Sequence, residues 1–80
     1  MWVKTSTNHI PTKALKAGED VDGSPLYVGR ARHECGFLIP GKVQPNYGFC
    51  YIAYDGEEFG KDEYEVLTKH KLFQMLKWKE

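Results

Sequence analysis

The sequence predicts a small all-β protein built from antiparallel strands. Turn signals recur at short, even intervals along its 80 residues, at positions 8–11, 22–25, 40–41, 45–48 and 55–56. The run Leu26–Arg32 alternates, and the run Phe49–Tyr54 is apolar at every position. Short runs of these two kinds between evenly spaced turns are typical of a sandwich or barrel.

The first elements are short strands. Ala14–Asp20 predicts a weak strand; its composition also suits a helix, but Gly18 and the turn at Asp22-Gly23 leave little room for one. Leu26–Arg32 predicts a strand with Tyr27, Gly29 and Ala31 on one face. Because that face is small, a second layer can approach it closely.

The later elements include the expected core strand. Phe49–Tyr54 predicts a strand covered on both sides, as in the middle of a sandwich. A charged turn at 55–58 follows, and Glu63–Leu67 predicts an alternating strand with Tyr64 and Val66 inward. The tail Thr68–Glu80 fits a helical stripe about as well as it fits a strand, and we favour a strand.

Composition excludes several classes of protein. Eleven basic and eleven acidic residues give zero formal net charge, which argues against nucleic-acid and membrane-surface binding. The first residues lack the basic and apolar regions of a signal peptide. The cytosol is therefore the default compartment, with vesicle association or unconventional release as alternatives.

The cysteines and histidines predict no cofactor and no metal. Cys35 and Cys50 are too far apart for a CxxC motif, so we expect two reduced thiols, with a bridge between them as the alternative. His9, His33 and His70 lack the spacing of zinc ligands. Ordinary surface or half-buried roles explain them better.

Beyond these patterns, a set of ordered motifs carries a family resemblance. They are Trp2, Ile10-Pro11, Ala14, Ala17-Gly18, Asp20, Gly23, Leu26-Tyr27-Val28-Gly29-Arg30-Ala31, Pro40-Gly41-Lys42, Gly56-Glu57 and Tyr64-Glu65-Val66-Leu67. This combination resembles the DM9 repeat, over residues 1–67. The resemblance implies an antiparallel β-sandwich of DM9 type, in which two repeats interlock. It also implies a calcium-independent lectin for mannose or mannose-containing glycans, of the kind that serves pattern recognition in innate immunity.

Here one repeat is present, and residues 68–80 form a separate C-terminal segment. Leu76–Glu80 resembles the opening Trp2-Val3-Lys4, as though a second repeat began there. Two chains exchanging their ends would rebuild the interlocked pair as a symmetric homodimer. A chain of 80 residues buries only a thin hydrophobic core, and association with a second copy is one way to stabilise such a chain. A monomer whose tail is helical or frayed is the alternative.

The resemblance assigns sugar binding to Asp20 and Lys42. The chemistry suits the role, because a carboxylate accepts bonds from two neighbouring hydroxyls while an ammonium donates to their oxygens. Taken alone, Asp20 would be explained as a turn residue and Lys42 as a solvated edge lysine. Pro40-Gly41 places the lysine on a rigid corner. We expect Glu19, Asp22 and Glu34 at the rim of the site.

Other residues have structural explanations. Arg30 is expected to brace the fold through a carboxylate. Tyr27, Tyr51 and Tyr54 can stack on a sugar ring, although aromatic residues in strands are more often core.

Two other classes of function compete with the lectin. An enzyme is disfavoured, because no nucleophile-base pair, phosphate loop or metal cluster stands out, and Glu57, Glu58, Glu63 and Glu65 fit solvated faces. The stronger alternative is a protein-interaction or scaffold module without sugar binding.

Overall fold

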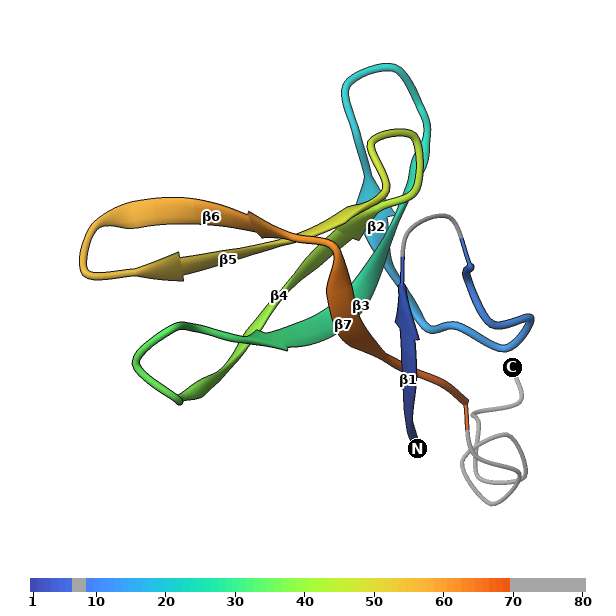
Figure 1. The fold of residues 1–80 in the computed structure, drawn as a ribbon. Coiled ribbons are helices and arrows are strands. Elements are labelled where there is room, and N and C mark those ends of the chain that lie inside the picture. Colours follow the sequence, from blue (N-terminus) through green and yellow to red (C-terminus); the bar gives the residue numbers. More distant parts are fainter. Residues whose placement is uncertain (7–8, 70–80) are drawn as a thin grey trace, which may run out of the picture.

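Seven antiparallel strands make up the fold of this computed structural model, which describes residues 1–6 and 9–69 (Figure 1). In chain order they are β1 (Trp2–Ser6), β2 (Lys16–Glu19), β3 (Pro25–Arg32), β4 (Leu38–Gln44), β5 (Phe49–Tyr54), β6 (Glu57–Lys61) and β7 (Glu63–Leu67). The predicted all-β antiparallel fold is confirmed. Within the described residues, no helix is long and apolar enough to cross a membrane.

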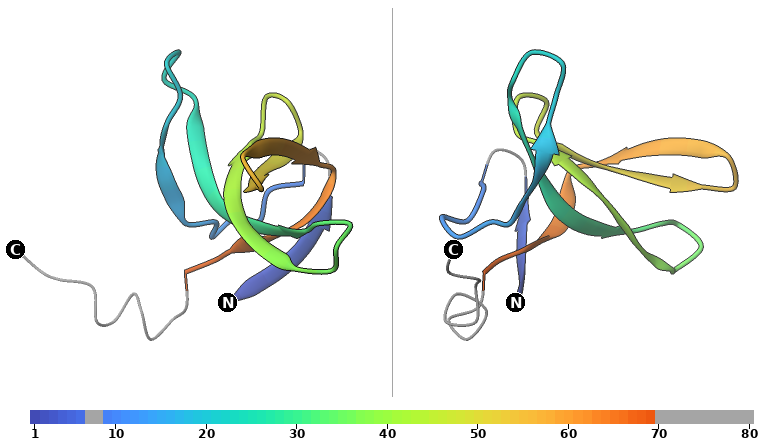
Figure 2. Two further views of the ribbon diagram at one scale, coloured as in Figure 1. Left: turned by 90° about the vertical axis from the view of Figure 1, so that its left-hand side faces the viewer. Right: turned by 180° about the vertical axis from the view of Figure 1, so that it is seen from behind.

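All seven strands belong to one sheet, in the order β1-β7-β3-β4-β5-β6, with β2 paired to β3. β3 is the central strand: β4 pairs with one edge, while β2 and β7 share the other. The sheet coils around its own inner face instead of forming two separate sheets (Figure 2).

A small core lies on the inner face of the coiled sheet. The buried hydrophobic side chains are Ala31, Val43, Cys50, Ile52, Tyr64 and Val66, which come from β3, β4, β5 and β7. The prediction that Tyr64 and Val66 point inward is confirmed. Gly29 is buried among them, and a Cβ there would lie 2.5 Å from Val43 Cγ2. The small face predicted for β3 therefore permits the close packing that the core requires.

The expectation for the apolar run was wrong in one respect. Cys50 and Ile52 of β5 are buried, but Phe49 is 37% exposed and Ala53 is also exposed. β5 is therefore covered on one side only, because the coiled sheet places no second layer over its outer face.

The turn and rigid corner predicted at Pro40-Gly41 were wrong, because both residues lie inside β4. Gly41 instead permits the close approach of β5, since a Cβ there would lie 2.9 Å from Ile52 Cγ2. The connection between β5 and β6 follows the predicted turn chemistry. Asp55 and Gly56 both have positive φ, 54° and 79°, and join β5 to β6 in a two-residue hairpin.

Cys35 and Cys50 are free thiols, the first exposed and the second buried. Thr68 bonds back to Met1, since its N–H donates to the Met1 carbonyl at 2.7 Å. The predicted strand in the tail falls mostly on residues 70–80, outside the described part of the chain.

Candidate functional site

The turn after β2 holds Asp20 beside the end of β4. Asp20 N–H donates to the Ser24 carbonyl at 2.8 Å, and Gly23 N–H donates to the Asp20 carbonyl at 2.9 Å. Gly23 has a φ of 88°, a conformation that glycine adopts without strain. The neighbouring β4–β5 loop is tied to this turn, because Asn46 Nδ2 donates to Ser24 Oγ at 2.8 Å. The two loops thus lie side by side.

The carboxylate of Asp20 is fixed by two donors. Its Oδ1 accepts from Val21 N–H at 2.8 Å, and its Oδ2 accepts from Gln44 Nε2 at 2.7 Å. The bond to Gln44 is partly buried. Asp20 therefore has a set orientation before any ligand arrives.

Lys42 shares an outer face of the sheet with Gln44. The two residues are separated by one position on β4, which places their side chains on the same face at a spacing of about 7 Å. Lys42 is exposed, and its ammonium makes no hydrogen bond or ion pair with the described residues. The structure thus brings Asp20 and Lys42 to one face, with Gln44 between them. We call these three residues the polar row.

An aromatic pair runs alongside the polar row. In the β4–β5 register, Lys42 lies opposite Tyr51 and Gln44 lies opposite Phe49, so all four share a face. The two rings meet edge to face, with centroids 6.1 Å apart. Gly60 of β6 lies directly across from Tyr51, and a Cβ there would lie 3.1 Å from its ring. The ring is therefore packed against backbone and keeps a fixed position.

The three residues expected at the rim have different surroundings. Glu19 pairs with Lys16 at 3.0 Å. Asp22 Oδ1 accepts from Ser24 N–H at 2.9 Å, and this bond lowers the pKa of the Asp22 carboxyl. Glu19 precedes Asp20 directly and Asp22 follows it by two positions, and the Asp22 carboxylate stabilises the turn.

Glu34 lies at the other end of the β3–β4 ladder, in the turn between the two strands. Its Oε2 accepts from Lys61 Nζ at 2.7 Å, which lowers the pKa of the Glu34 carboxyl. The structure does not bring Glu34 together with Asp20 and Lys42.

Arg30 and the remaining tyrosines occupy structural positions. Arg30 Nε donates to Glu65 Oε1 at 2.5 Å, and its guanidinium lies 4.0 Å from the centre of the Trp2 ring. Tyr27 packs against the core, and Tyr54 stacks on His33 with ring centroids 4.2 Å apart. Of the three candidate tyrosines, Tyr51 alone lies opposite a residue of the polar row.

Sequence reasoning missed Gln44 and Phe49 as site residues. The signal for Gln44 was its alternation with Lys42 along one strand, which puts both on one face. Phe49 was assigned to the core because every residue of its run is apolar. Among the described residues, no group of three His, Cys, Asp or Glu side chains is placed to hold a metal ion.

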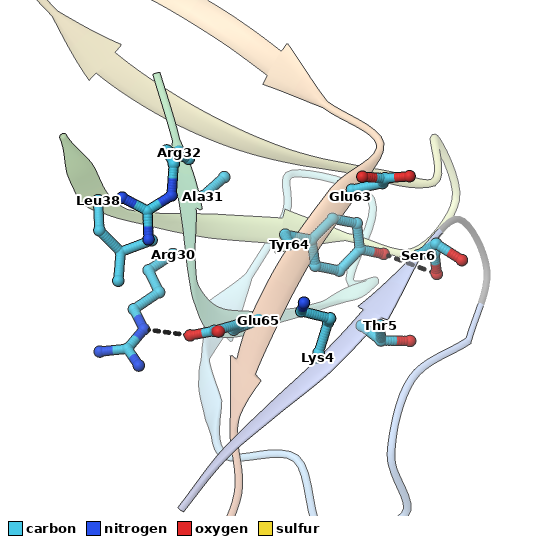
Figure 3. Close-up of a pocket in the computed structure, with 10 residues that line it drawn as sticks. All are labelled: Lys4, Thr5, Ser6, Arg30, Ala31, Arg32, Leu38, Glu63, Tyr64 and Glu65. Atoms are coloured by element: carbon cyan, nitrogen blue, oxygen red, sulfur yellow. Dashed lines mark hydrogen bonds and ion pairs between the residues drawn. The ribbon is translucent and has the colours of Figure 1, made fainter. Parts of the chain in front are cut away.

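A cavity of about 680 Å³ lies elsewhere, between β1, β7 and the end of β3 (Figure 3). Its lining includes Lys4, Arg30, Arg32, Tyr64 and Glu65, and none of the polar row. The polar row is therefore an open surface site. Shallow, preorganised polar surfaces of this kind suit small polar ligands such as sugars, whose hydroxyls bond to fixed donors and acceptors.

Comparison with known proteins agrees with these observations. The family model described as the DM9 repeat matches residues 1–59 and 20–80. Natterin-4 of Thalassophryne nattereri is 31% identical over 78 residues, which cover 98% of this chain and 19% of that protein. The chain thus spans about a fifth of the length of this relative. It belongs to the DM9 repeat family, which is associated with carbohydrate binding and with natterin proteins.

Proposed function

We propose that this chain is a non-catalytic, calcium-independent lectin that binds mannose and mannose-containing glycans through Asp20 and Lys42. The observation that carries the proposal is the polar row itself. Asp20 follows β2 and Lys42 lies on β4, yet a 2.7 Å bond from Gln44 fixes the Asp20 carboxylate on the Lys42 side of the sheet. A fixed acceptor and a donor on the same face suit the recognition of neighbouring hydroxyls.

The aromatic pair supports the same proposal. A sugar has polar edges and an apolar C–H face, and aromatic side chains offer an apolar surface that loses little conformational entropy on binding. Tyr51 and Phe49 lie directly opposite Lys42 and Gln44. A ring bound along the polar row would therefore contact their side chains.

The proposed site needs no calcium, because the Lys42 ammonium supplies the positive charge and donates to the hydroxyl oxygens of the sugar. Gln44 donates to the Asp20 carboxylate and keeps it in place. Glu19 and Asp22 stay at the rim of the site, whereas we leave Glu34 out because of its distant position on the ladder.

We further propose that two copies associate into a homodimer. Two observations support this: the described residues contribute six buried hydrophobic side chains to the core, and apolar side chains such as Phe37 and Leu38 are exposed at 62% and 38%. A dimer would present two shallow sites and bind multivalent glycans with avidity.

Calorimetric titration of mannose, with galactose as comparison and a chelator present throughout, tests the lectin proposal. We expect mannose-selective heat that the chelator does not change. Asp20→Asn and Lys42→Met should each weaken binding about tenfold or more, because each removes a hydrogen bond to a charged group. Lys16→Met is the matched control, since Lys16 is an exposed lysine that pairs with Glu19.

Absence of mannose heat from the folded wild-type protein would overturn the lectin proposal. It would favour the protein-interaction module instead, with the exposed Phe37 and Leu38 as its contact residues.

A further inference from the structure

The cavity in Figure 3 exists because β3 and β7 separate after a short stretch of pairing. β7 pairs with β3 only at Gly29 and Arg30, opposite Val66 and Glu65. Beyond that point β3 continues with β4 alone, and the start of β7 continues with β1 alone. The sheet therefore opens into a wedge, with the Arg30–Glu65 pair at its apex.

Backbone groups face this wedge from both sides. Val28 N–H donates to the Leu15 carbonyl at 3.0 Å, on the edge of β3 that faces away from β4. Backbone groups alternate between the two edges of a strand, so those of Arg32 point to the same side as those of Val28. On β7, the Leu67 carbonyl accepts from Leu15 N–H at 2.8 Å, and the same alternation directs Glu63 toward β3.

Arg32 and Glu63 would thus form the next rung of the ladder if the strands stayed together. By this alternation the Arg32 N–H points to the β7 side of β3, where Arg32 lines a cavity of about 680 Å³. This volume falls in the range of small-molecule sites.

The lining of the cavity carries more positive than negative charge. Lys4, Arg30 and Arg32 supply three cations, against the two carboxylates of Glu63 and Glu65. Glu65 is already paired with Arg30 at 2.5 Å. Arg32 uses one guanidinium nitrogen on the Gly36 carbonyl at 2.7 Å, and among the described residues Lys4 makes no ion pair. Two cations therefore remain against the single carboxylate of Glu63.

Thr5, Ser6 and Tyr64 complete the lining on the β1 and β7 side. The Thr5 hydroxyl donates to the His9 carbonyl and the Tyr64 hydroxyl to the Ser6 carbonyl, so these two serve the fold. Tyr64 is 3% exposed and, with Ala31 at 2%, provides a rigid floor. Cations and a backbone N–H around one opening are the groups that recognise oxygen anions.

We propose that this cavity is a second binding site, separate from the polar row, that takes an oxyanion on a small polar ligand. The group is a carboxylate, sulfate or phosphate, held by Lys4, Arg32 and the Arg32 backbone N–H. The carboxylate of Glu63 repels a second anionic group and accepts a bond from a ligand hydroxyl. The ligand class is therefore a hydroxylated molecule that carries one oxyanion group, such as an acidic or sulfated sugar.

The test is a titration of the ¹⁵N-labelled protein with sodium sulfate, with ionic strength kept constant by sodium chloride. We expect saturable shifts of the Thr5, Arg32 and Glu63 amide resonances. Lys4→Gln and Arg32→Gln should each raise the dissociation constant for sulfate about threefold, and the double variant should raise it about tenfold. Lys16→Gln, on β2 and outside the cavity lining, should leave it unchanged.

The natural source of the anion is distinguished by two more titrations, with glucuronate and with uncharged glucose. Tighter binding of glucuronate than of sulfate supports an acidic sugar, and the reverse supports a sulfate or phosphate group. The proposal is overturned if sulfate produces no saturable shift in the wild-type protein. It is equally overturned if the double variant binds sulfate as the wild type does. Mannose titration of the same double variant separates this site from the lectin site, because neither residue belongs to the polar row.

Discussion

At the scale of single residues, the proposed sugar site depends on the position of the Asp20 carboxylate. An aspartate in an exposed turn has many orientations, and the bonds from Val21 and Gln44 select one of them. Fixing a binding group in advance reduces the entropy lost when the ligand binds. In the proposed site Gln44 is a positioning residue, and we expect its replacement to affect binding more than folding.

Replacing Gln44 tests this role. Gln44→Leu should weaken mannose binding about tenfold, because it removes a hydrogen bond to a charged group. Calorimetry measures the affinity, and thermal unfolding checks that the fold is kept. Asn46→Ala, which removes the nearby exposed bond to Ser24, is the control and should change affinity little. Equal losses in the two variants would mean that loop structure in general, and not the orientation of Asp20, controls binding.

The two cysteines are predicted to react very differently. Cys50 has no exposed surface, and its burial raises the pKa of its thiol from 9.0 to about 11. Because the thiolate is the reactive form, native alkylation at neutral pH should modify the exposed Cys35 and spare Cys50 until the protein is unfolded. Mass spectrometry of the alkylated peptides measures this, and equal rates at both sites would contradict the burial of Cys50.

The same raised pKa has a consequence for stability. Between pH 9 and about 11 the unfolded chain ionises Cys50 while the folded chain keeps it protonated. The folded state then binds more protons, so the free energy of unfolding should fall as pH rises through this window. Cys50→Ala should remove that part of the pH dependence.

At the scale of elements, β3 is central to the fold because β2, β4 and β7 all pair with it. Its small inner face allows the close approach of Val43, and a side chain at Gly29 would displace it. Gly29→Ala should destabilise the protein by about 1–3 kcal/mol through overpacking. For a domain of this size, each kcal/mol lowers the melting temperature by about 4–8 °C.

Gly18→Ala provides the matched control for that prediction. A Cβ at Gly18 meets no atom within 4 Å, so the melting temperature should change little. Calorimetric or circular-dichroism melts of the two variants give the comparison. A Gly29→Ala protein that melts like Gly18→Ala would mean that β3 and β4 pack less closely than described.

Strand positions were predictable from local patterns, whereas the pairing of distant side chains was not. The alternation of Leu26–Arg32 identifies both the strand and its inner face. The continuous apolar run of β5 hides which side is covered, because outward Phe49 and inward Cys50 look alike in sequence. Glu34 was misleading in a similar way: it follows β3 closely in sequence, but the hairpin carries it away from Asp20. The contact between Asp20 and Gln44 spans 24 residues and depends on strand register alone.

At the scale of the whole molecule, the sheet leaves apolar side chains exposed, with Phe37 at 62% and Tyr47 at 61%. We predict a dimer with twice the 9.2 kDa mass of the chain. Light scattering at micromolar concentration measures the mass. A value near that of one chain would contradict the proposed exchange of chain ends.

We have proposed two chemically different sites for the whole molecule, the polar row and the cavity between β3 and β7. The measurement that tests the central claim most directly is a map of backbone amide shifts during a mannose titration of the ¹⁵N-labelled protein. The account predicts saturable shifts around Asp20, Lys42 and Gln44, and along Phe49 and Tyr51. Mannose shifts confined to the cavity around Arg32 and Glu63, or no saturable shifts at all, would contradict the assignment of the polar row as the sugar site.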